Sequence, residues 1–225
     1  MPVWSGWRKG STDRQTGELE GMVAVINYGM GNTGSIVNML HRIGEEAVVT
    51  DKRNELEEAD KIILPGVGAF DHGIQNLREK DLVDVIRRVT LEKKIPFLGI
   101  CLGMQLLGNK SEEGQEEGLG LIPFTNVRFR FEEPTLLKIP HMGWDIVNFQ
   151  QKDRILEGLE EMQRFYFVHS YYAICEKKEN ILMTCAYGHE FAAAVKNENI
   201  YGFQFHPEKS HRFGMKLLEN FVRRV

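Results

Sequence analysis

The sequence predicts an α/β domain built on a doubly wound, mostly parallel sheet flanked by helices, with antiparallel strands added in the second half of the chain. In the first half, short apolar runs alternate with segments whose apolar residues recur at helical spacing. This alternation favours parallel strands joined by crossover helices. In the second half, short runs rich in β-branched and aromatic residues follow one another with only turns between them, which favours antiparallel ribbons.

Each element of the first half has a local reason. A buried strand is predicted at 23–26, a short apolar run with glycines nearby on both sides. Helices are predicted at 35–43 and 81–93, because apolar residues recur there every three or four positions and share one helical face. The further strands are predicted at 46–50, 61–64 and 95–100, and the last leads into a helix that begins at Leu102.

The second half is predicted to be mainly strands. These are expected at 124–131, 144–149, 165–172, 181–187, 191–196 and 200–205. A final helix is predicted from about Arg212, because Phe213, Leu217, Phe221 and Val225 form an apolar stripe along it.

The 225 residues suffice for one domain with a sizeable core. Residues 1–21 show neither a helical nor a strand period and lack the apolar stretch of a secretory signal. We therefore expect residues 1–21 to be a mobile extension, a cloning remnant or the product of an upstream start, and residues 22–225 to form the domain.

Charge and cysteine content exclude several classes of protein. The 28 Lys and Arg against 32 Asp and Glu give a net charge of −4, which argues against a generally basic nucleic-acid-binding protein. No apolar run approaches the roughly 20 residues that cross a bilayer, so no membrane association is predicted. The 3 cysteines cannot all pair, which favours a reducing, cytoplasmic location. The acidic run at 112–117 is expected to be a solvated loop.

Cys101 stands at a predicted strand-to-helix turn within the segment GICLGMQ. Gly99 and Gly103 flank it, as a sharp and crowded turn requires. This is the arrangement of a nucleophile elbow, with sulfur in place of oxygen. Such a turn presents the nucleophile at the carboxyl edge of the sheet, and the following helix N-terminus favours the thiolate. An isolated cysteine is more often a buried structural residue, which is our interpretation of Cys175 and Cys185.

A thiolate nucleophile needs a base and a group that orients the base. His206 follows the strand predicted at 200–205, and Glu208 lies two residues further on, on the same side of an extended chain. Pro207 stiffens the segment between them. A carboxylate beside an imidazole sets its tautomer and stabilises its cation. Alone, this segment would be interpreted as a surface loop; together with the elbow it predicts a triad of Cys101, His206 and Glu208.

The turn PGVG follows another predicted core strand. The backbone N–H groups of Gly66, Val67 and Gly68, with that of Leu102 after the nucleophile, are candidates for an oxyanion hole. A Pro-Gly pair is by itself typical of a tight turn. Gln105 lies one helical turn after the nucleophile on the same face, where it would contact the polar end of a substrate.

A rival motif, G-x-G-x-x-G, occupies Gly29–Gly34 between a predicted strand and a predicted helix. With Asp51 further on, it is also the fingerprint of a dinucleotide-binding oxidoreductase. Two residues separate the strand from the first glycine, where the tight turn should already begin, so we expect these glycines to shape a loop at the sheet edge. No metal site is predicted, because His206 and His211 lack a third ligand at useful spacing.

These segments together resemble a known family, the class I or triad-type glutamine amidotransferases. The resemblance is carried by GICLGMQ (99–105), PGVG (65–68) and GFQFHPEKS (202–210). A likeness to the glutaminase subunits of imidazole glycerol phosphate synthase, in histidine biosynthesis, is carried by NYGMGN (27–32), PHMGW (140–144) and FVHSYY (167–172). Glutaminases that serve pyridoxal phosphate, GMP or anthranilate synthesis are the alternative, and a nicotinamide-binding oxidoreductase is a more distant one.

The resemblance implies a flavodoxin-like fold over about residues 22–225 and hydrolysis of glutamine to glutamate and ammonia without a cofactor. It implies that Cys101 is the nucleophile, that His206 is the general base and acid, and that Glu208 orients the imidazole.

The resemblance also implies a substrate site and a partner. Contacts to the amino-acid end of glutamine are implied for Gln105, Ser170 and Tyr171. The implied partner is a (β/α)8-barrel cyclase subunit, which forms a heterodimer with the glutaminase and receives its ammonia. Residues implied to lie near that interface are Met142, Trp144 and Lys209. The chain departs from the family pattern at Asp145, where asparagine is expected.

Overall fold

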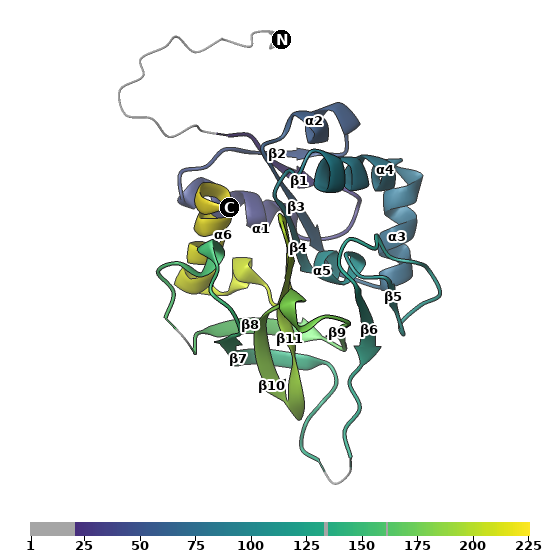
Figure 1. The fold of residues 1–225 in the computed structure, drawn as a ribbon, viewed down its shortest axis with the longest axis vertical. Helices are drawn as coiled ribbons and strands as arrows, with labels where there is room; N and C mark the ends of the chain where they lie inside the picture. The colour runs from purple at the N-terminus through teal and green to yellow at the C-terminus, as the bar shows by residue number, and fades with distance from the viewer. Residues whose placement is uncertain (1–20, 133–134, 161) are drawn as a thin grey trace, which may run out of the picture.

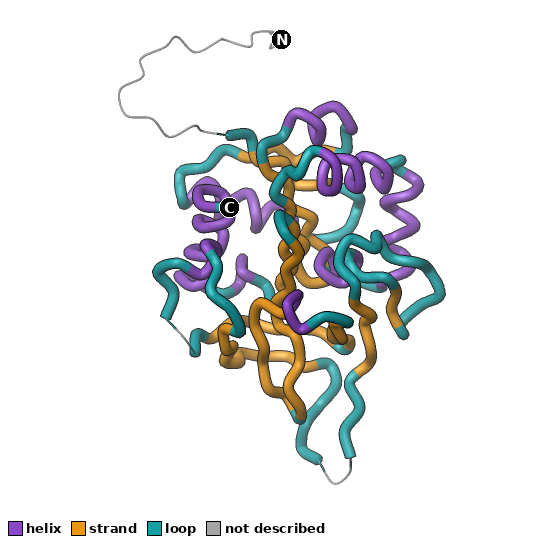
Figure 2. The backbone as a smooth tube through the Cα atoms, in the orientation of Figure 1, coloured by secondary structure: helices purple, strands orange, loops and turns teal. Residues whose placement is uncertain are grey.

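The computed structural model describes residues 21–132, 135–160 and 162–225. The predicted extension at 1–21 lies outside the described residues except for Gly21. Figures 1 and 2 show a sheet through the middle of the molecule with helices on both sides of its upper part. The predicted combination of a parallel sheet, flanking helices and added antiparallel strands is confirmed.

The strands are β1 (Val23–Ile26), β2 (Ala47–Thr50), β3 (Lys61–Gly66), β4 (Phe97–Cys101), β5 (Lys110–Ser111), β6 (Phe124–Arg128), β7 (His141–Phe149), β8 (Arg164–His169), β9 (Tyr171–Cys175), β10 (Ile181–Tyr187), β11 (His189–Asn197) and β12 (Ile200–Phe203). The α-helices are α1 (Thr33–Arg42), α2 (Arg53–Glu58), α3 (Phe70–Glu79), α4 (Leu82–Arg87), α5 (Leu102–Leu106) and α6 (His211–Arg224). The short helical segments are the π-helical η1 (Arg88–Glu92) and the 3-10 turns η2 (Arg154–Leu156), η3 (Lys178–Asn180) and η4 (Pro207–Lys209).

The parallel half of the sheet has the order β2-β1-β3-β4-β12. This is the flavodoxin-like strand order, in which ligands bind beyond the carboxyl ends of the strands. On its far side β12 pairs antiparallel with β11, and β10, β7 and β8 continue the antiparallel part. The ribbon of β6 and β9 joins at β11. The strand pairing therefore changes from parallel to antiparallel at β12, the strand that leads to His206.

Alternate residues of the central strands supply two apolar layers. Val23 and Val25 of β1 belong to the layer that packs against α1 and α6, whereas Ala24 and Ile26 belong to the layer against α2 to α5. This is the period of two expected of a strand with both faces covered. Figure 1 shows α1 and α6 on one side of the sheet and α3, α4 and α5 on the other.

Some elements differ from their predictions. Neither α2 nor α3 is predicted from the sequence. The helix predicted at 81–93 is α4 followed by the π-helical η1, where the hydroxyl of Thr90 donates to the Ile86 carbonyl at 2.7 Å. The strand predicted at 165–172 is two strands that separate at Ser170, because β8 pairs with β7 whereas β9 pairs with β6.

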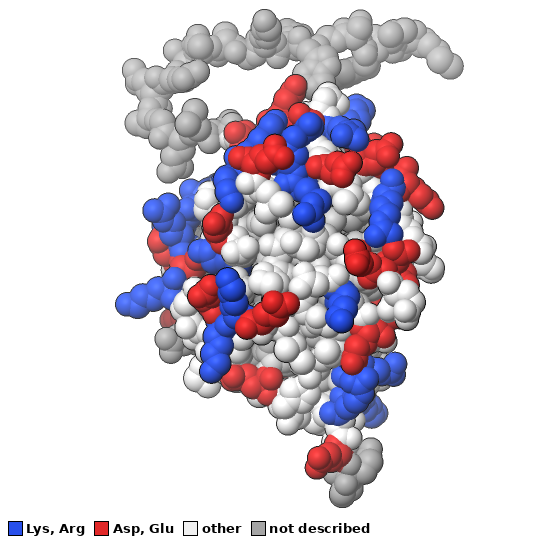
Figure 3. Space-filling model, turned by 45° about the vertical axis from the view of Figure 1, so that its right-hand side comes forward, with Lys and Arg blue, Asp and Glu red and all other residues white. Residues whose placement is uncertain are grey.

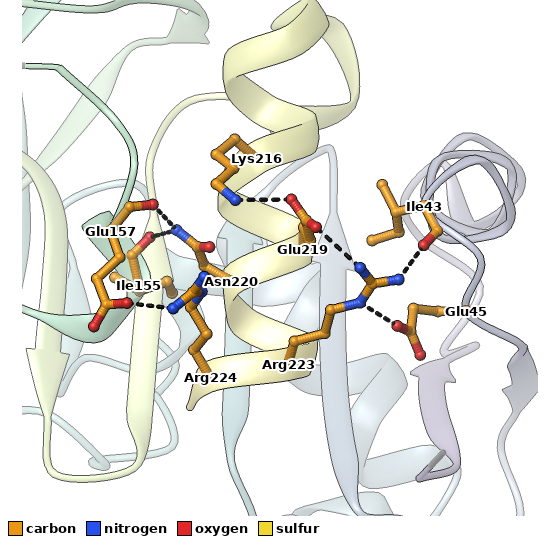
Figure 4. Close-up of polar contacts among 9 residues, drawn as sticks. All are labelled: Ile43, Glu45, Ile155, Glu157, Lys216, Glu219, Asn220, Arg223 and Arg224. Atoms are coloured by element: carbon orange, nitrogen blue, oxygen red, sulfur yellow. Dashed lines mark hydrogen bonds and ion pairs between the residues drawn. The ribbon is translucent and has the colours of Figure 1, made fainter. Parts of the chain in front are cut away.

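Side chains on two faces of α6 form hydrogen bonds and ion pairs with the segments on either side of this last helix (Figure 4). Buried Asn220 donates from Nδ2 to the carbonyl of Ile155 at 2.9 Å and to that of Glu157 at 2.7 Å. On another face of the helix, Arg223 forms an ion pair with Glu45 at 2.8 Å. These contacts anchor the helix that follows β12.

On the face shown in Figure 3, basic and acidic side chains are interspersed around a largely uncharged centre. This distribution agrees with the small negative net charge of the chain. Within the described part of the chain, no helix combines the length and the apolar character of a membrane span.

Candidate active site

Cys101 is the last residue of β4 and directly precedes α5. Its φ of +54° and ψ of −110° are a strained conformation for a residue with a side chain. A Cβ at Gly103 would lie 1.8 Å from the carbonyl oxygen of Leu64, and a Cβ at Gly99 would lie 2.5 Å from that of Gly103. The helix thus approaches the strands so closely that only glycine fits at these two positions, which is why the turn that holds the thiol requires them.

β12 is the neighbour of β4, and His206 and Glu208 follow its end; Glu208 lies in the 3-10 turn η4 rather than in an extended chain as expected. The Nδ1 atom of His206 is 2.7 Å from Oε1 of Glu208, and both side chains are nearly excluded from solvent. Nε2 of His206 is buried without a hydrogen-bond partner among the described residues. Burial lowers the pKa of His206, but the neighbouring Cys101 and the hydrogen-bonded Glu208 outweigh it and raise the pKa to about 10. The imidazole is therefore positively charged at neutral pH.

Parallel pairing brings the candidate groups to one edge of the sheet. Because β4 lies between β3 and β12, Cys101 is opposite Gly66 on one side and adjoins the end of β12 on the other. The Sγ atom lies 3.9 Å from the carbonyl oxygen of Val168 and 4.0 Å from Nε2 of Gln204. Neither Val168 nor Gln204 is predicted as a site residue, since nothing in their spacing relates them to the thiol.

A cavity of about 300 Å³ adjoins the thiol. It is lined by Val67, Gly68, Cys101, Leu102, Gln105, Glu113, Pro140, Val168, His169, Ser170, Tyr171 and His206. The structure therefore brings together most of the residues predicted for the nucleophile, its base, the oxyanion segment and the substrate contacts. Glu208 and Gly66 are not part of the lining, although each is next to a residue that is: Glu208 through its hydrogen bond to His206, and Gly66 through the chain.

The candidate oxyanion segment follows the carboxyl end of β3. Gly66 is buried, Val67 is exposed, and Gly68 has a φ of +117°, which favours glycine. A Cβ at Gly66 would lie 2.4 Å from the hydroxyl oxygen of Tyr28 and 2.9 Å from Cβ of Leu102. The segment thus passes directly over the start of α5, where the added Cβ would also lie 2.8 Å from the backbone nitrogen of Gly103.

Gln105 is held in place by two hydrogen bonds. Its Nε2 donates to the carbonyl of Tyr171 at 3.2 Å and to Oε1 of Gln204 at 3.1 Å. Both amide hydrogens are therefore engaged, and Oε1 is left as an acceptor for a bound molecule. β8 ends just before Ser170 and β9 begins just after it, and this interruption between the strands lets Ser170 and Tyr171 line the cavity.

Glu113 is a cavity residue that the sequence does not reveal. It belongs to the acidic run expected to be a solvated loop; Glu113 is indeed exposed and in a turn, and it also lines the cavity. Its Oε2 accepts from the backbone N–H of Phe70 at 2.8 Å, at the start of α3. Among the described residues of the lining it is the only carboxylate. The run reaches the cavity by packing against α3, a helix that is itself not predicted.

The three residues implied near a partner, Met142, Trp144 and Lys209, lie outside the cavity. Met142 is 62% exposed and Trp144 is 40% exposed. Trp144 lies opposite Tyr166 across β7 and β8, and Nζ of Lys209 lies 5.5 Å from the centre of the Tyr166 ring. We define Met142, Trp144, Tyr166 and Lys209 as the Trp144 patch. The patch adjoins the candidate triad, because the carbonyl of Tyr166 accepts from the N–H of His206 at 2.9 Å.

The first two glycines of the rival motif lie in a loop against the end of β3, whereas Gly34 belongs to α1. Gly29 and Gly31 have φ values of +85° and +99°, and a Cβ at Gly31 would lie 3.0 Å from the carbonyl oxygen of Pro65. Asp51, the candidate ribose-binding residue, forms an ion pair with Lys80 at 2.6 Å. Across the described ranges, no group of three or more His, Cys, Asp and Glu is arranged to hold a metal ion.

A comparison with protein families decides between the alternatives. The family model described as glutamine amidotransferase class-I matches residues 24–225. The chain belongs to the class I glutamine amidotransferase family. This membership accounts for the elbow and the parallel sheet together, and it removes the basis for a dinucleotide-binding interpretation of Gly29–Gly34.

Relatives of this amidotransferase include two proteins named imidazole glycerol phosphate synthase subunit HisH 2. The one from Methanococcus maripaludis is 54% identical over 204 residues, which is 91% of this chain and 100% of that protein. The one from Pseudomonas aeruginosa is 52% identical with the same coverage.

Solved structures show the same fold at low sequence identity. PurLQS from Thermotoga maritima matches with a TM-score of 0.69 at 20% identity, covering 91% of this chain and 98% of that one. A putative GMP synthase protein from Thermoplasma acidophilum matches with a TM-score of 0.68 at 19% identity, covering 92% of this chain and 94% of that one.

Proposed function

We propose that this amidotransferase is the glutaminase subunit of an imidazole glycerol phosphate synthase and hydrolyses glutamine to glutamate and ammonia. The observation that carries the proposal is the buried 2.7 Å hydrogen bond between His206 and Glu208, beside the strand that ends in Cys101. The HisH relatives at 54% and 52% identity support this synthase. The similarity to the GMP synthase protein, at 19% identity, concerns the fold alone.

In the first half of the reaction, the thiolate of Cys101 attacks the side-chain amide carbon of glutamine and a C–S bond forms. The positive charge on His206 favours the anionic form of a neighbouring sulfur. His206 then gives its Nε2 proton to the nitrogen as the C–N bond breaks. Glu208 holds Nδ1–H, so that Nε2 is the atom that transfers the proton. The products are ammonia and a γ-glutamyl thioester.

In the second half, a water molecule attacks the thioester while His206 accepts its proton. The C–S bond breaks, glutamate leaves, and the thiolate is restored. Both halves place a negative charge on the former amide oxygen. We assign its stabilisation to the backbone N–H of Leu102 and to those of Gly66, Val67 and Gly68, because this segment passes over the start of α5.

The amino-acid end of glutamine carries an ammonium and a carboxylate group. Glu113 supplies a negative charge at the cavity that complements the ammonium group. Oε1 of Gln105 is a second acceptor, held by the two bonds of its amide nitrogen. Ser170 and Tyr171 form another part of the wall. This set selects an amino acid whose amide, rather than its ammonium end, meets the thiol.

The partner we infer is a (β/α)8-barrel cyclase subunit that docks on the Trp144 patch and forms a heterodimer. Exposed aromatic and Met side chains are typical of interface centres, and the patch adjoins the triad through Tyr166. Ammonia protonates in water and loses its nucleophilicity, so direct transfer into the partner has a chemical purpose. A cytosolic location fits the three free cysteines, Cys101, Cys175 and Cys185.

The test is a glutaminase assay of the chain alone and with the cyclase subunit. We expect low turnover alone, clear stimulation by the cyclase, and no turnover by Cys101→Ala in either condition, although that variant should still bind glutamine. Cys175→Ala is the control, because Cys175 lies on β9 outside the cavity lining. Turnover by Cys101→Ala would refute the nucleophile, and full activity without the cyclase would refute the coupling.

A further inference from the structure

A hydrogen-bonded chain runs from the wall of the thiol cavity to the protein surface. Nδ1 of His169 lies 2.7 Å from the carbonyl oxygen of Tyr171. Nε2 of His169 lies 3.0 Å from Nδ1 of His141, and Nε2 of His141 lies 2.8 Å from Oδ2 of Asp145. His169 lines the cavity, whereas the Asp145 side chain is 41% exposed. The proposed reaction uses neither histidine.

The three contacts of this chain need three hydrogens. The carbonyl of Tyr171 and an ionised Asp145 can only accept, and a neutral imidazole carries a single N–H. Two neutral rings thus supply two hydrogens for three contacts. If each ring donates toward Tyr171, Nε2 of His141 and the carboxylate of Asp145 meet as two acceptors. The opposite tautomers move the same conflict to the carbonyl at the other end. The chain is complete only when it holds one added proton.

Of the two rings, His141 is the one that lies against a carboxylate and can carry that proton. Burial lowers the pKa of His169 to about 3 against the effect of its bond to the carbonyl, so this ring stays neutral. The ring of His141 lies between those of Phe167 and Tyr187, with centroids 4.8 Å and 4.0 Å away, and aromatic faces attract a cation. Burial lowers the pKa of His141 below its usual value of 6.5, and Asp145 opposes this effect.

Other titratable groups surround the chain. Tyr187 stacks on His141, Cys185 interacts with Asp145, and His206 interacts with His169. Tyr172 and His189 are one ring further away, because they contact Phe129, which packs against both histidines. Burial raises the pKa of Cys185 to about 12, so its thiol is neutral. His206 is positively charged and contributes to the low pKa of His169. None of these surrounding groups is a carboxylate, so Asp145 is the anion with which the added proton pairs.

The inner end of the chain shares its acceptor with the substrate site. The carbonyl of Tyr171 accepts from His169 and also from Nε2 of Gln105 at 3.2 Å. Val168, next to His169, places its carbonyl oxygen 3.9 Å from Sγ of Cys101. When Nδ1 of His169 carries a hydrogen, it donates to the carbonyl of Tyr171 and holds this stretch of backbone at the cavity wall. When Nδ1 carries none, its lone pair repels the same carbonyl oxygen.

We propose that His169, His141 and Asp145 are positioning residues of the thiol site, and that the chain they form holds the segment 168–171 in its substrate-binding position when it carries the added proton. The kinetic consequence rests on the proposed glutaminase function, whereas the proton requirement follows from the three contacts alone. Asparagine at position 145 would donate the third hydrogen from its own amide. With Asp145 the three hydrogen bonds therefore depend on the added proton, whereas with asparagine at this position they would form without it.

The proton requirement is tested by ¹⁵N and ¹³C NMR of the full chain between about pH 5 and about pH 8, the range in which histidine titrates. We expect the ring nitrogens of His141 and the carboxyl carbon of Asp145 to report a shared proton at the acidic end, with His169 neutral throughout. In Asp145→Asn, His141 should be neutral over the whole range. A wild-type pair that never holds a proton, or an identical titration of His141 in Asp145→Asn, would overturn the proposal.

The positioning role is tested by the KM for glutamine of the complex with the cyclase. We expect KM to rise roughly fivefold when the wild-type pair loses its proton, the effect of about one lost hydrogen bond, while kcat does not follow that step. Asp145→Asn should keep the low KM at every pH, and Asp145→Ala should do so as well, because two neutral rings supply the two hydrogens that its two remaining contacts need. Coinciding KM profiles for the wild type and Asp145→Asn would refute the role. If no form hydrolyses glutamine, the proposed function fails while the NMR result stands.

Discussion

His206 and Glu208 are joined by a 2.7 Å hydrogen bond across Pro207, and both side chains are nearly excluded from solvent. The second carboxylate oxygen of Glu208 is buried without a partner among the described residues. The imidazole is therefore the main compensation for a buried negative charge, and the carboxylate is a main reason that the imidazole is positively charged. Changing either residue leaves the other with an uncompensated charge.

Replacing Glu208 with glutamine should lower kcat for glutamine hydrolysis by about 10²–10⁴-fold, the usual contribution of a general acid–base. A neutral amide cannot stabilise the imidazolium that protonates the leaving nitrogen. KM should change little, because Glu208 does not line the cavity. Steady-state kinetics with the cyclase measure both constants. Glu179→Gln, at an exposed residue of η3, is the control; a Glu208→Gln enzyme within a few-fold of that control would contradict the assigned role.

The raised pKa of His206 also predicts how stability depends on pH. The folded protein holds this proton up to about pH 10, whereas the unfolded chain releases it near 6.5. The folded state thus binds more protons between these values, so the stabilisation is complete below about 6.5 and is lost as the pH rises to about 10. The difference in free energy of unfolding between wild type and His206→Gln, measured by urea denaturation, should shrink over this window. A difference that stays constant or grows would show that His206 is not charged in the folded protein.

The parts of the fold that the sequence predicts are those with a clear period or a clear turn. β1 is a buried apolar run, and α6 carries a stripe that includes Leu217 and Phe221, so both are predicted closely. The helix α2 has six residues and a single buried one, Leu56, which is too short a segment for a period. The helix α3 does carry a pattern, since Phe70, Ile74 and Leu77 are buried at helical spacing, and that pattern would have revealed it.

The candidate site divides in the same way. Cys101 can be proposed from the sequence because it ends a strand between two glycines with a steric role, and His206 and Glu208 because they follow a strand with only Pro207 between them. Glu113 is not, because tertiary packing alone brings an acidic loop to the cavity. The interruption between β8 and β9 at Ser170 is not predicted, because β-forming residues continue on both sides of it and indicate a single strand. What the sequence leaves out is thus the part of the site that depends on contacts between distant segments.

Gly103 should be intolerant of any side chain. A Cβ there would lie 1.8 Å from the carbonyl oxygen of Leu64, which is backbone and cannot move aside. We expect Gly103→Ala to reduce the free energy of unfolding by about 3 kcal/mol, more than the roughly 1 kcal/mol that alanine gains in a helix. Gly34→Ala in α1, where the nearest atom is 3.9 Å from the added Cβ, is the matched control and should be neutral or stabilising. Equal stability of the two variants in urea denaturation would contradict the close approach of α5.

Glu113→Gln tests the carboxylate at the cavity. Glutamine keeps an acceptor for the N–H of Phe70, so folding should be preserved, but the negative charge opposite the substrate ammonium is lost. The KM for glutamine should rise roughly ten- to hundredfold, the effect of losing one charged hydrogen bond, with a smaller change in kcat. Glu117→Gln, in the same acidic run but outside the cavity lining, should keep the wild-type KM. If both variants bind glutamine equally well, Glu113 does not contact the substrate.

Asn220 should be the most sensitive polar residue of α6, because its side chain is buried and donates to two carbonyl groups of the segment around η2 (Figure 4). Asn220→Ala leaves the carbonyls of Ile155 and Glu157 without this donor and should cost about 1–3 kcal/mol of unfolding free energy. Asn220→Asp has nearly the same shape but places a carboxylate against the same two carbonyls, so it should cost more. Lys216→Ala, which removes a partly exposed ion pair with Glu219, should cost at most about 1 kcal/mol. Urea denaturation of the three variants should give this order; an Asn220→Asp protein as stable as the wild type would mean that the two carbonyls obtain no hydrogen bond from this residue in solution.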